Sequence, residues 1–271
     1  MNETIRSGDR AADAMRPVRV ELGPMKYAEG SALIDMGDTR VLVSASVENR
    51  VPPFLRDKGL GWVTAEYAML PRATSTRSAR EVTKGKPSGR SSEIQRLIGR
   101  SLRAVVDRSA FPDRTLYIDC DVLQADGGTR TAAITGAWVA MVQAFGHLFL
   151  TGDIKNWPVV GQMAAVSAGV VQDIPLLDLE YSEDSIADVD MNVVATRDGS
   201  IIEIQGTGET RSFSRAELDQ LIDLALGGIA RLGEYQDQAL EPVMAEVRAL
   251  RDRPDRRPAE PRDEKDLWGA P

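Results

Sequence analysis

A glycine pair followed by two polar residues, Gly127-Gly128-Thr129-Arg130, is the first feature of the chain that could carry chemistry. Glycines let a backbone approach a ligand closely, and free N–H groups at the start of a helix favour an anion. Thr129 and Arg130 add side-chain donors. The run is neither a Walker A loop nor a dinucleotide-binding fingerprint. We therefore expect an anion site here, with a tight turn beside a charged flank as the alternative.

Arg90 is a second candidate for anion binding, because it follows Ser88-Gly89 close to a predicted helix start. A guanidinium can hold a phosphate through two parallel hydrogen bonds. The alternative is an arginine on a surface loop. The chain is acidic overall, at −8, yet residues 72–103 hold nine Lys/Arg against two Asp/Glu. This local block indicates either a polyanion partner or a solvated basic face.

The third candidate is acidic and comprises Asp184, Asp188 and Asp190, within residues 173–192, which hold seven acids and no base. On a strand that begins near residue 188, Asp188 and Asp190 would share one face with Asn192. Carboxylates without a basic neighbour repel one another, and Mg²⁺ suits such oxygen ligands. The alternative is a set of acids on an edge strand that face water.

The scarcity of cysteine and histidine excludes several other chemistries. The single cysteine, Cys120, excludes an internal disulfide framework and a cysteine-based zinc site, and it favours a reducing compartment. The single histidine, His147, is predicted to be a packed core residue without a catalytic role. The N-terminal residues lack the pattern of a secretory signal, and the apolar stretch 137–150 is too short to span a bilayer. These features predict a soluble, cytoplasmic protein.

Helices and strands must bring these candidates together, and their patterns predict an α+β protein. Alternation and turn residues predict strands over 31–35, 41–47, 116–123, 159–171, 189–195 and 200–204. Capping-box patterns predict two helices, one that begins at Ser92 and ends near Arg108, and one that begins after Ser214. A helix over 131–150 is apolar almost all round and is therefore predicted to be buried. The glycine pair lies between a strand and this buried helix.

The domain organisation predicted from these elements is one α+β domain over residues 1–240, because no long linker separates strands from helices. Residues 241–271 form a C-terminal extension, predicted as a short helix followed by a charged tail. Residues 253–271 contain four prolines and ten charged residues whose charges cancel. This composition predicts disorder.

Two anion sites, a cation site and a basic tract together fit phosphoryl chemistry on a polyanion. The same residues stand in long runs that resemble the bacterial ribonuclease PH family. The runs cover residues 61–74, 88–103, 118–132, 188–194 and 205–209, within a collinear resemblance over about residues 10–240. The amino acids at residues 6–10 and 23–27 differ from the family pattern.

The resemblance implies the α+β ribonuclease PH fold, with mixed β-sheets packed with helices, as in polynucleotide phosphorylase and the exosome ring subunits. It implies a phosphate-dependent 3′→5′ exoribonuclease that trims the 3′ ends of tRNA precursors and releases nucleoside diphosphates. The reverse reaction would add nucleotides to RNA 3′ ends. The expected assembly is a homohexamer, a trimer of dimers.

The resemblance also implies roles for individual residues. The attacking inorganic phosphate would be held by Arg90, Gly128, Thr129 and Arg130. Mg²⁺ and catalysis would depend on Asp184 and Asp190. Contacts to tRNA would come from an arginine set in the basic block, namely Arg72, Arg77 and Arg80.

Two other classes of function stay open at this point. A ring subunit that only binds RNA would be expected to lack Arg90, Arg130 or the acidic pair, and this chain has them all. A metal-dependent hydrolytic nuclease would use water and would have no use for a phosphate site. Phosphate as the nucleophile accounts for the absence of an evident Ser, Cys or His nucleophile.

Overall fold

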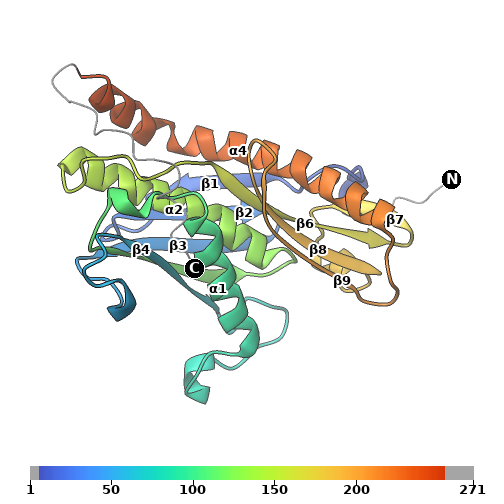
Figure 1. Ribbon diagram of the computed structural model, residues 1–271. Coiled ribbons are helices and arrows are strands. Elements are labelled where there is room, and N and C mark those ends of the chain that lie inside the picture. The colour runs from blue at the N-terminus through green and yellow to red at the C-terminus, as the bar shows by residue number, and fades with distance from the viewer. Residues whose placement is uncertain (1–5, 254–271) are drawn as a thin grey trace.

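Two β-sheets make up the framework of the computed structural model, which describes residues 6–253. The five-stranded sheet has the order β1-β2-β3-β5-β4, and the four-stranded sheet has the order β7-β6-β8-β9 (Figure 1). The strands are β1 Val18–Leu22, β2 Gly30–Met36, β3 Thr39–Glu48, β4 Trp62–Met69, β5 Thr115–Gln124, β6 Met163–Val171, β7 Ile174–Leu177, β8 Val189–Thr196 and β9 Ile201–Gly208.

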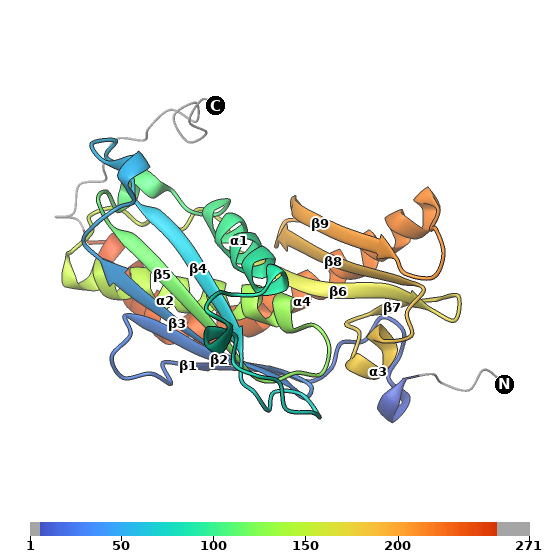
Figure 2. The same ribbon diagram turned by 90° about the horizontal axis from the view of Figure 1, so that it is seen from below.

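The helices are α1 Gly89–Arg103, α2 Thr129–Thr151, the single turn α3 Tyr181–Asp184, and α4 Arg215–Arg251. Short 3₁₀ turns lie at Ser7–Asp9, Pro53–Leu55, Glu81–Lys84 and Arg108–Ala110. In Figure 2 the two sheets lie on either side of α1. The α+β prediction with mixed sheets is confirmed.

The five-stranded sheet is mixed because β4 and β5 pair in parallel, whereas its other pairs are antiparallel. A parallel pair needs a long crossover connection. Here the crossover consists of the loop 70–88, α1 and the 3₁₀ turn that precedes β5. The basic block of the sequence therefore lies on this crossover, beside the carboxyl ends of β4 and β5.

The strands predicted over 31–35, 41–47, 189–195 and 200–204 are present and form two hairpins. β2 pairs with β3 across a tight turn, and β8 pairs with β9 across Asp198-Gly199, where Gly199 has a φ of 90°. The alternation predicted for β5 is also confirmed, because Ile118, Cys120 and Val122 are buried while their neighbours face the other way. Period-two patterning was sufficient for β3 and β5, because buried residues alternate with less buried ones along most of each strand.

Helix α2 lies at the centre of the fold and packs against β2 and β3 of one sheet and β6 of the other. It is long and apolar enough to cross a membrane by length and composition, but 83% of its most apolar window is buried inside the protein. It is thus a core helix, longer than the apolar stretch 137–150 suggested. The prediction that His147 is a packed core residue was wrong, because this residue is exposed. It lies on a polar stripe with Gln143 and Thr151, four residues apart on one helix face.

Helix α1 begins earlier than predicted. Its N-cap is Ser88, whose hydroxyl accepts a hydrogen bond from the Ser91 amide at 3.1 Å. The helix ends at Arg103 because the following chain turns extended, with Val106 forming a β-bridge to Val159. Arg90 therefore lies in the first turn of the helix rather than before it.

Helix α4 is 37 residues long and begins at the predicted capping box, formed by Ser214 and Glu217. It continues through residue 240 and contains Pro242. Val247, beyond the predicted domain boundary, is fully buried. The extension predicted over 241–271 thus begins inside a continuous helix. Most of its charged tail, residues 254–271, lies outside the residues that the structure describes.

Candidate active site

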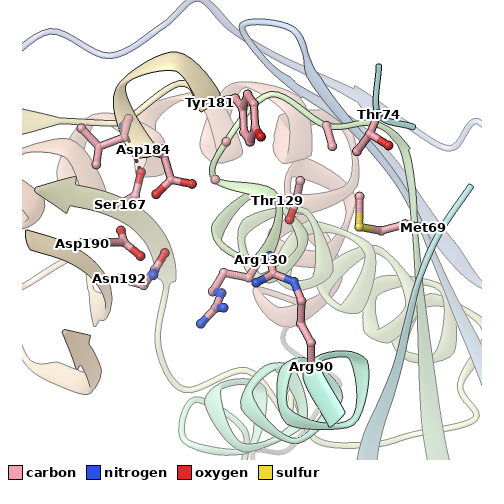
Figure 3. A pocket seen from close by; sticks show the side chains of 14 residues that line it. Met69, Thr74, Arg90, Thr129, Arg130, Ser167, Tyr181, Asp184, Asp190 and Asn192 are labelled. Atoms are coloured by element: carbon pink, nitrogen blue, oxygen red, sulfur yellow. Dashed lines mark hydrogen bonds between the residues drawn. The ribbon is translucent and has the colours of Figure 1, made fainter. Parts of the chain in front are cut away.

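A cavity of about 380 Å³ opens where the carboxyl end of β5, the start of α1, α3 and β8 meet. Of the predicted site residues it gathers Arg90, Gly128, Thr129, Arg130, Asp184 and Asp190. Figure 3 shows Arg90 and Arg130 pointing into one space, with the carboxylates of Asp184 and Asp190 across it. Arg90 and Asp190, which are 100 positions apart in the sequence, thus line a single cavity.

The glycine pair forms the tight connection between β5 and α2. Gly127 and Gly128 have φ values of 72° and 64°, which a residue with a side chain rarely adopts. A Cβ on Gly127 would lie 2.5 Å from the carbonyl oxygen of Leu179, so a side chain would also clash. Among residues 6–253 the amides of both glycines have no hydrogen-bond partner, and α2 begins directly after them. The loop therefore offers free N–H groups at a helix N-terminus, where an anion is favoured.

Arg130 is held in place by residues from two other elements. Its Nη1 donates to Oε1 of Gln205 on β9 at 2.7 Å, and lies 3.8 Å from Oε2 of Glu93 on α1. The Nε2 of Gln205 in turn donates to Glu93 at 2.8 Å. This chain of contacts leaves other guanidinium N–H groups of Arg130 available to the cavity. The roles of Glu93 and Gln205 had no signal in the sequence, because their contacts join distant segments.

Arg90 is held less firmly. Its guanidinium makes no hydrogen bond or ion pair within the described part of the chain, and the residue is exposed. Its positive charge, with that of Arg130, opposes the effect of burial on the pKa of Asp184, which is nevertheless raised. The two arginines therefore lie close enough to the carboxylates to interact with them through the cavity.

The carboxylates of Asp184 and Asp190 approach the cavity from α3 and β8, and Asn192 lies beside them. Burial, and then the charge of Asp184, raise the pKa of Asp190 from 3.8 to about 6. Asp188 does not line the cavity, and its carboxylate instead accepts a hydrogen bond from the Thr210 hydroxyl. The predicted cluster of three acids is thus a cavity pair and one separate residue.

A divalent metal ion fits the donor set that the cavity presents. The donors are the carboxylate oxygens of Asp184 and Asp190 and the amide oxygen of Asn192, which are the ligands that Mg²⁺ prefers. Neither carboxylate forms an ion pair with a basic side chain in the described residues. A cation between them would offset both the burial and the repulsion from Asp184 that raise the pKa of Asp190.

The three loop arginines predicted to contact tRNA, Arg72, Arg77 and Arg80, are all exposed and do not line the cavity. They lie on the loop that follows β4, and this loop contributes Thr74 to the cavity wall. The basic loop is thus continuous with the rim of the cavity.

Three arginines near the N-terminus contact the segment that carries Asp184. Arg6 and Arg10 donate to the buried carboxylate of Glu183, at 2.7 Å and 2.9 Å. Arg16 Nη2 donates to Asp178 at 2.7 Å, and both side chains are buried. The departure of residues 6–10 from the family spelling therefore does not remove these contacts.

Paired arginines, a free helix N-terminus and facing carboxylates define a site for phosphoryl chemistry. Comparison with known proteins agrees. Residues 14–145 match domain 1 of the 3′ exoribonuclease family, and residues 161–228 match domain 2. The chain therefore belongs to the 3′ exoribonuclease family.

A close relative specifies the branch of this family. The chain is 62% identical over 235 residues to ribonuclease PH of Syntrophomonas wolfei, covering 87% of this chain and 98% of the relative. The branch is thus ribonuclease PH, as the sequence runs indicated.

Solved structures share the fold at lower identity. An Archaeoglobus fulgidus exosome with RNA bound to the active site has a TM-score of 0.72 at 24% identity, over 86% of this chain and 92% of that one. Rice Rrp46 has a TM-score of 0.70 at 19% identity, over 87% of this chain and all of its own. These likenesses confirm the predicted fold.

Proposed function

We propose that the cavity removes nucleotides one at a time from the 3′ end of tRNA precursors, with inorganic phosphate as the nucleophile. Membership of the ribonuclease PH branch makes the chain a phosphorolytic 3′ exoribonuclease that processes tRNA. The observation that supports the assignment of residues is the shared cavity, in which the arginines and the free helix N-terminus face the carboxylate pair.

The residues divide the reaction between binding and charge stabilisation. Arg90 and Arg130 bind the attacking phosphate, while the amides at Gly128 and the Thr129 hydroxyl orient it. A phosphate oxygen attacks the last phosphodiester, and the bond from that phosphorus to the 3′ oxygen of the preceding nucleotide breaks. The leaving 3′ oxygen takes the proton that the attacking hydrogen phosphate loses, and the terminal nucleotide departs as a nucleoside diphosphate. The same steps in reverse add a nucleotide.

Asp184 and Asp190, with Asn192 beside them, would hold Mg²⁺. When bound, the ion would neutralise charge on the transferring phosphoryl group and on the leaving oxygen. The arginines across the cavity keep phosphate on the opposite side from these carboxylates. The two sides of the cavity therefore bind opposite charges, the phosphate anion beside α2 and the cation beside β8.

The loop arginines Arg72, Arg77 and Arg80 bind the body of the tRNA in this proposal, because they are exposed and continuous with the cavity rim. We further propose a cytoplasmic homohexamer, a trimer of dimers. Support comes from the resemblance and from the shared fold with an archaeal exosome core, at a TM-score of 0.68 and 22% identity. Light scattering on the purified protein would give the assembly mass.

Trimming of a tRNA precursor with and without inorganic phosphate tests the function. We expect trimming only with phosphate, and nucleoside diphosphates as the product. Nucleoside monophosphates released in phosphate-free buffer would show water as the nucleophile and would favour a hydrolytic nuclease. RNA binding without turnover under either condition would instead favour a ring subunit that only binds RNA.

A further inference from the structure

The backbone carbonyls of the glycine loop, residues 126–128, are all engaged. The carbonyl oxygen of Asp126 accepts from Arg16 Nη1. The carbonyl oxygen of Gly127 accepts from the Thr39 hydroxyl at 2.6 Å, and that of Gly128 accepts from the Thr131 hydroxyl at 2.9 Å. Three consecutive carbonyls are thus held by three side chains.

This arrangement decides where the loop amides point. In a planar trans peptide the C=O of one residue and the N–H of the next point in opposite directions. Holding the carbonyls of residues 126, 127 and 128 therefore fixes the directions of the amides of residues 127, 128 and 129. A carbonyl turned into the cavity would repel an anion, whereas an amide attracts it.

Thr39 holds the loop by two bonds at once. Besides donating to Gly127, its hydroxyl accepts from the Asp126 amide at 2.9 Å. It stands at the first position of β3, directly after the tight turn from β2, and is fully buried. Thr39 does not line the cavity, so it acts on the ligand only through the loop.

Arg16 holds the loop from the other side and joins it to the acidic half of the site. Its guanidinium and its backbone N–H both donate to Asp178, at 2.7 Å to Oδ1 and 2.8 Å to Oδ2. Asp178 is fully buried and precedes α3, the element that carries Asp184. Arg16 therefore connects the anion half of the cavity to the carboxylate half.

We propose that Thr39 and Arg16 are positioning residues that present the loop amides to the attacking phosphate. The proposal rests on the proposed function. It assigns to Thr39 the orientation of the loop itself, and to Arg16 the position of the loop relative to the segment that carries Asp184.

Thr39→Val tests this, because valine keeps the shape of threonine and removes both hydroxyl bonds. Thr39→Ser restores the hydroxyl and serves as the rescue. Thr135→Val is a matched control, since the buried Thr135 hydroxyl also donates to a carbonyl and accepts from an amide, both of Ala165, at 3.1 Å and 3.0 Å. All variants are compared in the full chain by circular dichroism and thermal unfolding before kinetics.

We expect Thr39→Val to raise the phosphate KM by roughly ten-fold, the effect of losing an interaction of hydrogen-bond size at the loop. At saturating phosphate kcat should change little, and binding of a tRNA precursor should be unchanged. Thr39→Ser should restore most of the phosphate KM, and Thr135→Val should leave it at the unsubstituted value. This split between phosphate and RNA is what a merely structural role would not produce.

An unchanged phosphate KM in folded Thr39→Val would overturn the proposal, as would an equal rise in Thr135→Val. If Thr39→Val does not fold, Arg16→Lys provides the test. Lysine keeps the positive charge, but it lacks the planar guanidinium that donates to both the Asp126 carbonyl and the Asp178 carboxylate. A folded Arg16→Lys protein with unchanged phosphate KM would count against the inference. Failure of the unsubstituted enzyme to need phosphate would instead refute the proposed function itself.

Discussion

At the scale of single residues, the cavity combines one arginine that is held and one that is free. Arg130 is anchored by Gln205 at 2.7 Å, whereas Arg90 has no partner among the described residues. Both line the same cavity from different helices. Phosphate binding should therefore depend on both guanidinium groups, with neither able to replace the other.

Replacing Arg90 or Arg130 by alanine should raise the phosphate concentration needed for trimming by roughly ten- to a hundred-fold. A hydrogen bond to a charged group contributes about 1.5–3 kcal/mol, at about 1.4 kcal/mol per decade. Lysine at either position should restore only part of the loss, because it lacks the planar fork. Phosphate titrations of the trimming rate measure this, and equal losses in tRNA affinity would contradict it.

The double substitution Asp184→Asn with Asp190→Asn should abolish turnover and leave tRNA binding largely intact. The pair serves metal binding and the chemical step in the proposed function, whereas the RNA contacts lie on the loop. Filter binding and trimming on one preparation measure both properties. Loss of the folded signal in circular dichroism would return the pair to a structural role.

The pKa of Asp190 predicts a pH dependence of stability. Because this pKa is raised to about 6, the stabilising contribution of the protonated group is present at low pH and is lost as the pH rises through about 6. In EDTA, Asp190→Asn should therefore gain on the order of 2 kcal/mol of unfolding free energy near pH 7.5. Near pH 4 the gain should nearly vanish. Urea unfolding measures both, and a gain independent of pH would refute the assignment.

At the scale of elements, the crossover between β4 and β5 carries two groups of arginines to which the proposed function gives different roles, tRNA binding and phosphate binding. Its loop holds the exposed arginines, and α1, which follows, places Arg90 in its first turn. Another exposed arginine, Arg19, lies on the edge strand β1 and provides a comparison. Substitutions in the loop should thus affect the binding of a large folded RNA, whereas substitutions in the cavity should also affect a short one.

Replacing Arg72, Arg77 and Arg80 together by alanine should weaken the binding of a folded tRNA far more than the binding of a short unstructured oligonucleotide. The slope of log affinity against log salt should become shallower by roughly 0.7 to 0.9 for each phosphate contact removed. Arg19→Ala is the control and should change neither quantity. A salt slope for tRNA that stays unchanged in the triple variant would rule out the loop as the binding surface.

At the scale of the whole molecule, α4 closes the fold over α2. The residues beyond 240 continue this contact, since Val247 is fully buried and a Cβ on Gly146 would lie 2.5 Å from Val243. The predicted boundary at residue 240 therefore falls within a packed helix. This predicts a stability difference between two truncations.

A chain that ends at Leu240 should be less stable than one that ends at Arg253 by several kcal/mol. A fully buried aliphatic side chain contributes about 1.5–3 kcal/mol. The shorter chain loses the fully buried Val247 together with Val243, Met244 and Leu250, which are partly buried and pack against the core. The longer chain lacks only the charged tail and should match the full protein. Thermal unfolding of the three chains measures this. Equal stability of the two truncations would make residue 240 a true domain boundary.

Local elements and the types of residue available for chemistry could be predicted from the amino-acid sequence. The alternation around Cys120, the capping box at Ser214 and the turn at Asp198-Gly199 depend on contacts within a few residues, so their patterns are visible in the chain. The glycine pair between a strand and a helix was visible for the same reason. Long runs of residues that match the ribonuclease PH pattern also indicated the family.

Which of these residues meet depends on the packing of distant elements and could not be predicted from local patterns. Arg90 and Asp190 share a cavity because the parallel pairing of β4 with β5 and the packing of α2 between two sheets bring their elements together. The exposure of His147 likewise depends on which face of α2 is covered, which an apolar composition does not reveal. The contacts of Thr39 with the glycine loop had no sequence signal, because hydrogen bonds across about 90 residues depend on sheet register rather than on local pattern.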